Sequence, residues 1–239
     1  MAVLNLPAIK AALRRLQRLF PQINKELFDR RDPLDDEVLS NMLEGYAMVD
    51  RLIREDVDIF AMGQLHYWLE LNAIVLCGVG DAVRLDHRRL IEATENRFYG
   101  QPDGGIRDIM DWYARNRGES VWRRAAGVYI RVLSEPQLFI EGNHRAGALI
   151  MSYVLAREGR APFVLTDKNA REYFNPSSVF KKSNKRSIMM RLKMPGLTRA
   201  LADYLKRQAN KAFLDSTESA QAGTGDNPRS STVVGHDEP

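Results

Sequence analysis

Apolar residues recur at intervals of three and four along most of this 239-residue chain, and this spacing restricts it to a helical fold. Side chains three or four positions apart share one face of an α-helix, whereas the apolar residues of a half-buried strand alternate. In residues 8–28, for example, the apolar positions fall on one side and basic residues lie opposite. The same pattern predicts further helices over residues 35–53, 57–77, 86–97, 107–116, 120–134, 143–159 and 195–213. The predicted fold class is therefore all-α.

Composition divides the chain into three parts. Residues 1–34 are predicted to be an N-terminal helical extension that ends at the Asp32-Pro33 break, and residues 35–213 to be the main helical domain. Residues 214–239 are rich in Ser, Thr, Gly and acids, and they have almost no large apolar side chains. Such a segment buries too little surface to offset the entropy lost on ordering, so we expect a disordered acidic tail.

The remaining composition excludes several classes of protein. The single cysteine, Cys77, allows no internal disulfide and fits a reducing compartment, and with only four scattered His a structural zinc site is not expected. No run approaches the roughly 18 apolar residues of a membrane span. We also expect no signal peptide and a cytoplasmic location, with secretion as an effector left open. Outside residues 215–239 the chain carries a net charge of +8, which suits acidic ligands such as nucleotides.

One stretch indicates a chemical site. Residues 139–147 read FIEGNHRAG, so an acid precedes Gly142-Asn143 and Arg145 follows them. The first N–H groups of a helix have no partner within it, so a helix that begins near Asn143 offers donors to an anion. An arginine one turn into the helix adds a cation. The stretch therefore predicts an anion-binding site.

The stretch QLFIEGNHRAGA, from Gln137 to Ala148, resembles the signature of the Fic family. That signature reads His, Pro, Phe, any residue, Asp or Glu, Gly, Asn, Gly or Lys, Arg, two residues of any kind, Arg. Signature residues stand at five of the seven positions from 139 to 145, namely Phe139, Glu141, Gly142, Asn143 and Arg145. The resemblance covers roughly residues 35–210 and implies a Fic-like helical domain in which Phe139 anchors the loop.

Fic proteins are mainly nucleotidyltransferases that move AMP from ATP to a protein hydroxyl, a reaction called AMPylation. Some relatives transfer phosphate, UMP or phosphocholine. The resemblance implies ATP or another nucleotide with Mg²⁺ as the cofactor, and a carboxylate such as Glu141 suits that hard ion. It also implies a phosphate bound by the N–H groups around Gly142, Asn143 and His144, and by the guanidinium of Arg145.

Three of the departures from the family signature concern its chemistry. Gln137 stands where the family has the His that acts as general base, and an amide has no useful basicity near pH 7. Ala148 replaces the second Arg, which removes one cation that would bind phosphate. His144 occupies the position of Gly or Lys. Its side chain would either contact phosphate, act as a displaced base, or only face solvent in the turn.

Two other segments also resemble functional parts of Fic proteins. Ser40 and Glu44 have the spacing of the inhibitory helix that many members carry, and an ordinary surface helix is the alternative. The turn-rich residues 98–106 are compatible with a small β-hairpin flap, at which the family aligns a target protein by strand addition.

The segment 181–193, KKSNKRSIMMRLK, contains six bases and no acid. This basic face is expected to be a solvated surface or the rim of a nucleotide pocket, and the alternative is that it holds a protein or RNA. It lacks the interleaved aromatic residues of a single-strand binder, so nucleic acid is not the expected partner.

The sequence thus favours a divergent Fic-like protein that keeps a nucleotide or phosphate site but lacks standard AMP transfer, a pseudoenzyme. The first alternative is an active nucleotidyl- or phosphoryltransferase that uses His144. The second is an interaction module that uses the basic face of residues 181–193.

Overall fold

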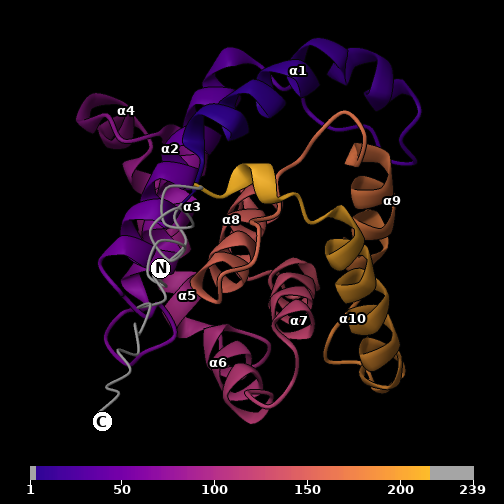
Figure 1. The fold of residues 1–239 in the computed structure, drawn as a ribbon. Coiled ribbons are helices and arrows are strands. Elements are labelled where there is room, and N and C mark those ends of the chain that lie inside the picture. The colour runs from indigo at the N-terminus through magenta and orange to yellow at the C-terminus, as the bar shows by residue number, and fades with distance from the viewer. Residues whose placement is uncertain (1–3, 216–239) are drawn as a thin grey trace, which may run out of the picture.

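The computed structural model describes residues 4–215 and shows an all-α fold, as the sequence predicts (Figure 1). Of the predicted acidic tail, all but Leu214 and Asp215 lies outside the described residues. The helices are α1 (Leu6–Lys25), α2 (Asp36–Arg54), α3 (His66–Cys77), α4 (Asp81–Asp86), α5 (Arg88–Gly100), α6 (Ile106–Arg115), α7 (Val121–Leu133), α8 (Asn143–Arg157), α9 (Ala170–Lys181), α10 (Ile188–Gln208) and the 3₁₀ turn η1 (Lys211–Phe213). No helix within residues 4–215 is long and apolar enough to cross a membrane.

Helices α7 and α8 form the centre of the molecule. Most residues of both helices are buried, so each is covered by neighbours on nearly all sides. In α8 every residue from Ala146 to Ala156 is buried. Helices α2 and α3 pack against α8, while α6, α9 and α10 contact α7. The anion-site loop, residues 134–142, connects α7 to α8 and therefore leaves from the middle of the core.

Helix α1 has one apolar face, and that face is buried. Its N-terminus is capped by Asn5, whose side chain accepts a hydrogen bond from the backbone N–H of Ala8 at 3.1 Å. The first part of the helix packs on α2, and the second part forms a smaller apolar cluster with Ala170 at the start of α9. Because α1 reaches both α2 and α9, the α1–α2 segment (residues 26–35) is brought near the start of α8.

Several predicted boundaries were wrong. The helix predicted over 57–77 begins only at His66. Residues 57–65 form turns instead, and Gly63 within them has a φ of +84°. The predicted β-hairpin is also absent: among the described residues, 98–106 comprise the end of α5, a short turn and the start of α6. Helix α10 begins at Ile188, seven residues before the predicted start, and it continues through Pro195. Helix α9 was not predicted at all, since Pro176 lies inside it.

Candidate functional site

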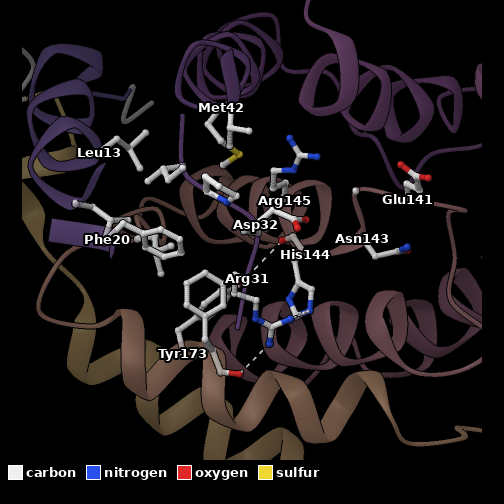
Figure 2. Close-up of a pocket in the computed structure, with 18 of the residues that line it drawn as sticks. Leu13, Phe20, Arg31, Asp32, Met42, Glu141, Asn143, His144, Arg145 and Tyr173 are labelled. Carbon is white, nitrogen blue, oxygen red and sulfur yellow. Dashed lines mark hydrogen bonds between the residues drawn. The ribbon is translucent and has the colours of Figure 1, made fainter. Parts of the chain in front are cut away.

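A cavity of about 640 Å³ lies beside the first turn of α8 (Figure 2). Residues from the loop before α8 and from its first turn form one wall, and α9 forms another. The remaining walls come from α1, α2 and the α1–α2 segment. One part of the lining is apolar, and it includes Leu13, Leu16 and Phe20 of α1 and Phe174 of α9. The cavity therefore joins an apolar surface to the charged residues near the start of α8.

The start of α8 presents free backbone donors. Its N-cap residue, Gly142, has a left-handed backbone with a φ of +73°, and no side chain caps the helix. The N–H groups of Asn143, His144 and Arg145 have no acceptor within residues 4–215. The partial positive charge of a helix N-terminus adds to these donors. This turn therefore has three backbone donors that are free within residues 4–215.

Asn143 fixes the shape of the loop. Its side-chain oxygen accepts a hydrogen bond from the N–H of Phe139 at 2.9 Å, and its amide nitrogen donates to the carbonyl of the same residue at 2.8 Å. The side chain is buried, so these two bonds are not replaced by water. The side chain of Asn143 is therefore engaged in holding the loop, and only its backbone N–H is left as a donor.

Phe139 and Gln137 also hold the loop. Phe139 is fully buried and stacks against Phe98 of α5, with ring centroids 5.8 Å apart. The Gln137 amide donates to the Leu133 carbonyl at 3.2 Å, and its side-chain oxygen accepts from Asn143 at 3.3 Å. The side chain at the position of the family's general base is thus bound to the loop and to the end of α7.

Arg145 lines the cavity without an acidic partner. One of its terminal nitrogens donates to the backbone carbonyl of Val75 in α3, and no carboxylate within residues 4–215 forms an ion pair with it. Burial lowers the pKa of this guanidinium, although Asp32 and other nearby acids oppose the shift. A partly buried cation that is not paired is a favourable ligand for an anion.

Arg31, in the α1–α2 segment, reaches the same site. Its Nη2 donates to the Ser178 hydroxyl at 2.7 Å. Its Nη1 lies 3.3 Å from Nε2 of His144 (Figure 2). A guanidinium has donors only, so Nε2 of His144 must be the acceptor of this bond. The ring proton is then on Nδ1, which lies 3.1 Å from the hydroxyl of Tyr129. Both nitrogens of His144 are thereby engaged by the protein.

The surroundings of His144 favour its neutral form. Burial, followed by the charges of Arg31 and Lys181, lowers the pKa of His144 to about 3. At neutral pH the ring therefore carries no charge to attract phosphate and has little basicity.

Glu141 lies at the rim of the cavity. Its side chain is exposed, and Figure 2 shows it apart from Arg31 and His144. Within residues 4–215 no three His, Cys, Asp or Glu side chains gather into a metal-binding group. A single carboxylate fits a Mg²⁺ ion only if the ion also binds phosphate oxygens of a ligand and water.

The structure does not bring Ser40 and Glu44 to this site. Both are exposed on α2, whereas Val38, Met42 and Tyr46 of that helix line the cavity. A separation of two residues places side chains on nearly opposite sides of a helix. Ala148 does line the cavity and is almost fully buried.

The basic residues of 181–193 do not form one surface. Lys181 lines the cavity, Lys182 pairs with Asp29 at 2.9 Å, and Arg186 pairs with Asp103 at 3.1 Å. Lys185 donates to the Arg131 carbonyl at 2.6 Å, and burial is the main cause that lowers its pKa to about 7. Two of the six bases are thus in ion pairs and Lys185 is bonded to a carbonyl, whereas Arg191 and Lys193 are exposed.

Sequence reasoning missed Arg31 and Tyr129. Tyr129 appears in the sequence only as an apolar position of α7, and nothing local marks the hydroxyl that reaches His144. Arg31 stands in an RRDP turn in which the only readable signal is the break at Asp32-Pro33. An arginine beside a proline-containing turn is a weak indication, because its contact with the site depends on how α1 packs.

Comparison with known proteins adds no family assignment: no family model matches the chain, and no curated protein or solved structure matches it either.

Proposed function

We propose that this protein binds a phosphate-containing small molecule in the cavity beside α8. The proposal rests on two features of one turn: three backbone N–H groups that find no acceptor in the described part of the chain, and an arginine that forms no ion pair there. Free donors at a helix N-terminus and a guanidinium fork both suit phosphate oxygens. The apolar lining from α1 and α9 suits the organic part of the ligand.

The class of ligand that we infer is a nucleotide, as the resemblance to Fic proteins implies. ATP with Mg²⁺ is the first candidate. Glu141 is the residue that would contact the ion, which would supply charge neutralisation for the phosphate groups. Arg145 and the first N–H groups of α8 would orient those groups, and the walls of α1 and α9 would exclude water from the organic part.

We further propose that the protein does not carry out standard AMP transfer. The side chain at the base position, Gln137, has no basicity and is bonded to Leu133 and Asn143. Loss of a general base typically lowers a rate by about 10² to 10⁴-fold. The alternative in which His144 takes the proton has less support, because Tyr129 and Arg31 occupy both ring nitrogens. An interaction module that uses residues 181–193 has less support as well, because Lys182 and Arg186 are in ion pairs and Lys185 is buried against the Arg131 carbonyl.

Calorimetric titration of the full chain with ATP, with and without Mg²⁺, tests the proposal. We expect saturable binding that Arg145→Gln weakens at least about ten-fold, since hydrogen bonds to charged groups are worth that much. Arg14→Gln is the matched control, because Arg14 is exposed on α1 outside the cavity. Incubation with labelled ATP should show no label transfer to protein. Transfer that His144→Ala abolishes would overturn the pseudoenzyme proposal.

The double variant Gln137→His, Ala148→Arg introduces the general base and the second arginine of the Fic signature. It tests whether these are the only groups that the site lacks for AMP transfer. Ala148 lines the cavity, so an arginine there would project into it. Transfer of labelled AMP by the double variant would support an otherwise intact nucleotide site.

A further inference from the structure

Arg31 has donors that the protein does not use. Its Nε is buried and has no hydrogen-bond partner among the described residues, and the guanidinium forms no ion pair with any carboxylate of residues 4–215. Its other contacts are neutral: His144, the Ser178 hydroxyl and the Phe174 carbonyl. Leaving a charged donor of this kind unsatisfied costs free energy. Nη1 makes one hydrogen bond, to His144, and so keeps a second N–H that an anion in the cavity could accept from.

The position of Arg31 is fixed by the chain around it. The Asn24 side chain accepts from the Arg31 backbone N–H at 2.8 Å and donates to the Arg31 carbonyl at 2.7 Å. The guanidinium also lies over the ring of Phe174, 5.2 Å from its centroid. A cation held by its backbone and its side chain loses little entropy when it binds a ligand.

Arg31 and Arg145 lie on different sides of the first turn of α8. The guanidinium of Arg145 is bonded to Val75 in α3, whereas that of Arg31 is bonded to Ser178 in α9. Helices α3 and α9 lie on opposite sides of α8 (Figure 1). In Figure 2 the guanidinium of Arg31 lies beside the His144 ring, whereas that of Arg145 lies above it and away from Arg31. A single phosphate group at the start of α8 would be near one of them, whereas a longer anion could reach both.

We propose that Arg31 binds a second phosphate group of a ligand whose first group lies at the N-terminus of α8, so that the cavity selects diphosphates and longer chains over monophosphates. This inference rests on the proposed function. It makes the α1–α2 segment part of the binding site. Arg31 would then supply the second cation at a site where the Fic signature has its second arginine and this chain has Ala148. When the anion binds Arg31, the contact between Nη1 and His144 is exchanged for bonds to phosphate oxygens.

Titration of the full chain with inorganic pyrophosphate and with inorganic phosphate tests the inference. The wild-type protein should bind pyrophosphate at least about ten-fold more tightly than phosphate, as one extra charge-assisted contact implies. Arg31→Gln should remove most of this preference and leave the affinity for phosphate within about two-fold. Arg31→Lys, which keeps the charge but not the planar fork, should retain part of the preference. Arg14→Gln should leave both affinities unchanged.

The outcomes separate the two proposals. If the wild-type protein binds neither anion nor ATP, the proposed function fails, and this inference fails with it. If Arg145→Gln weakens both anions while Arg31→Gln leaves the preference for pyrophosphate intact, only the inference is overturned. Equal weakening of both anions by Arg31→Gln would also overturn it, because Arg31 would then contact the first phosphate group. Circular dichroism of each variant checks that the helical fold is retained.

Discussion

Nη1 of Arg31 lies 3.3 Å from Nε2 of His144, and this contact joins residues that are 113 positions apart in the chain. It connects the α1–α2 segment to the first turn of α8 at the point where the backbone donors are free. The same contact fixes the tautomer of the histidine, which burial, followed by the charges of Arg31 and Lys181, keeps neutral. At this point of the cavity Arg31 therefore supplies the positive charge, and His144 supplies none.

His144 should remain neutral across the physiological pH range. Burial and the charge of Arg31 lower its pKa to about 3, whereas an unperturbed histidine titrates near 6.5. An NMR titration of the imidazole signals, with His144 assigned through its absence in His144→Asn, should show no midpoint between pH 5 and 8 at this residue. In Arg31→Gln the pKa should rise, because a like charge is removed. A wild-type midpoint near 6.5 would contradict the structure.

The same shift predicts how stability depends on pH. Between pH 3 and 6.5 the unfolded chain binds a proton at His144 that the folded chain does not bind, so the free energy of unfolding should decrease as the pH falls through this range. Urea denaturation at pH 7.0 and 5.0 measures the decrease, which should be smaller in His144→Asn. An equal decrease in both proteins would assign the effect to other groups.

Asn143→Ala should destabilise the protein by about 2–4 kcal/mol, because the buried N–H and carbonyl of Phe139 both lose their partner. The free energy of unfolding from urea denaturation measures the change. Asn96→Ala is the control, since Asn96 is exposed on α5 and alanine favours helix. If the two variants are equally stable, the side chain of Asn143 does not hold the loop.

Gly142→Ala should cost more stability than Gly159→Ala. Both glycines have a positive φ, +73° and +67°, so both variants incur about 1 kcal/mol of backbone strain. A Cβ on Gly142 would lie only 2.9 Å from the amide nitrogen of Asn72, whereas nothing lies within 4 Å of one on Gly159. Because both variants have the same backbone strain, the difference between their losses in free energy of unfolding measures the cost of the contact with Asn72. Equal losses would mean that the loop moves to accommodate the methyl group.

Lys185 should make the protein more stable as the pH rises from about 7 to about 10. Burial, followed by Arg131, lowers the pKa of Lys185 to about 7, so in this range the unfolded chain binds a proton that the folded chain has released. Denaturation at pH 7.0 and 9.5 should show a gain that Lys185→Met lacks. Lys10→Met, at an exposed position on α1, should keep the gain.

The sequence was informative where helices have strong apolar periodicity. The ends of α1, α2, α7 and α8 fall close to the predicted ones, because each has a repeating apolar face or an apolar run between clear breaks. Prediction failed where tertiary contacts override local pattern. Residues 57–65 are apolar enough for a helix, yet the carbonyl of Ile59 accepts from the Trp68 indole and the carbonyl of Val57 accepts from the Tyr153 hydroxyl. These contacts hold the segment in turns.

The loop from Gln137 to Arg145 could be located from sequence because its residues are adjacent and form one turn. What could not be predicted is the orientation of their side chains. Asn143 turns back to the loop, and Glu141 lies at the rim. The contribution of Arg31 depends on α1 packing against both α2 and α9, and no local pattern specifies that arrangement.

The most direct test of the central claim is an NMR titration of the backbone amides of Asn143, His144 and Arg145 with ATP and Mg²⁺. If phosphate binds at the start of α8, these three signals should shift together and saturate, and Arg145→Gln should weaken the binding that they report at least about ten-fold. If the protein binds ATP while these three amides do not shift, or binds no phosphate compound at all, the proposed site is wrong.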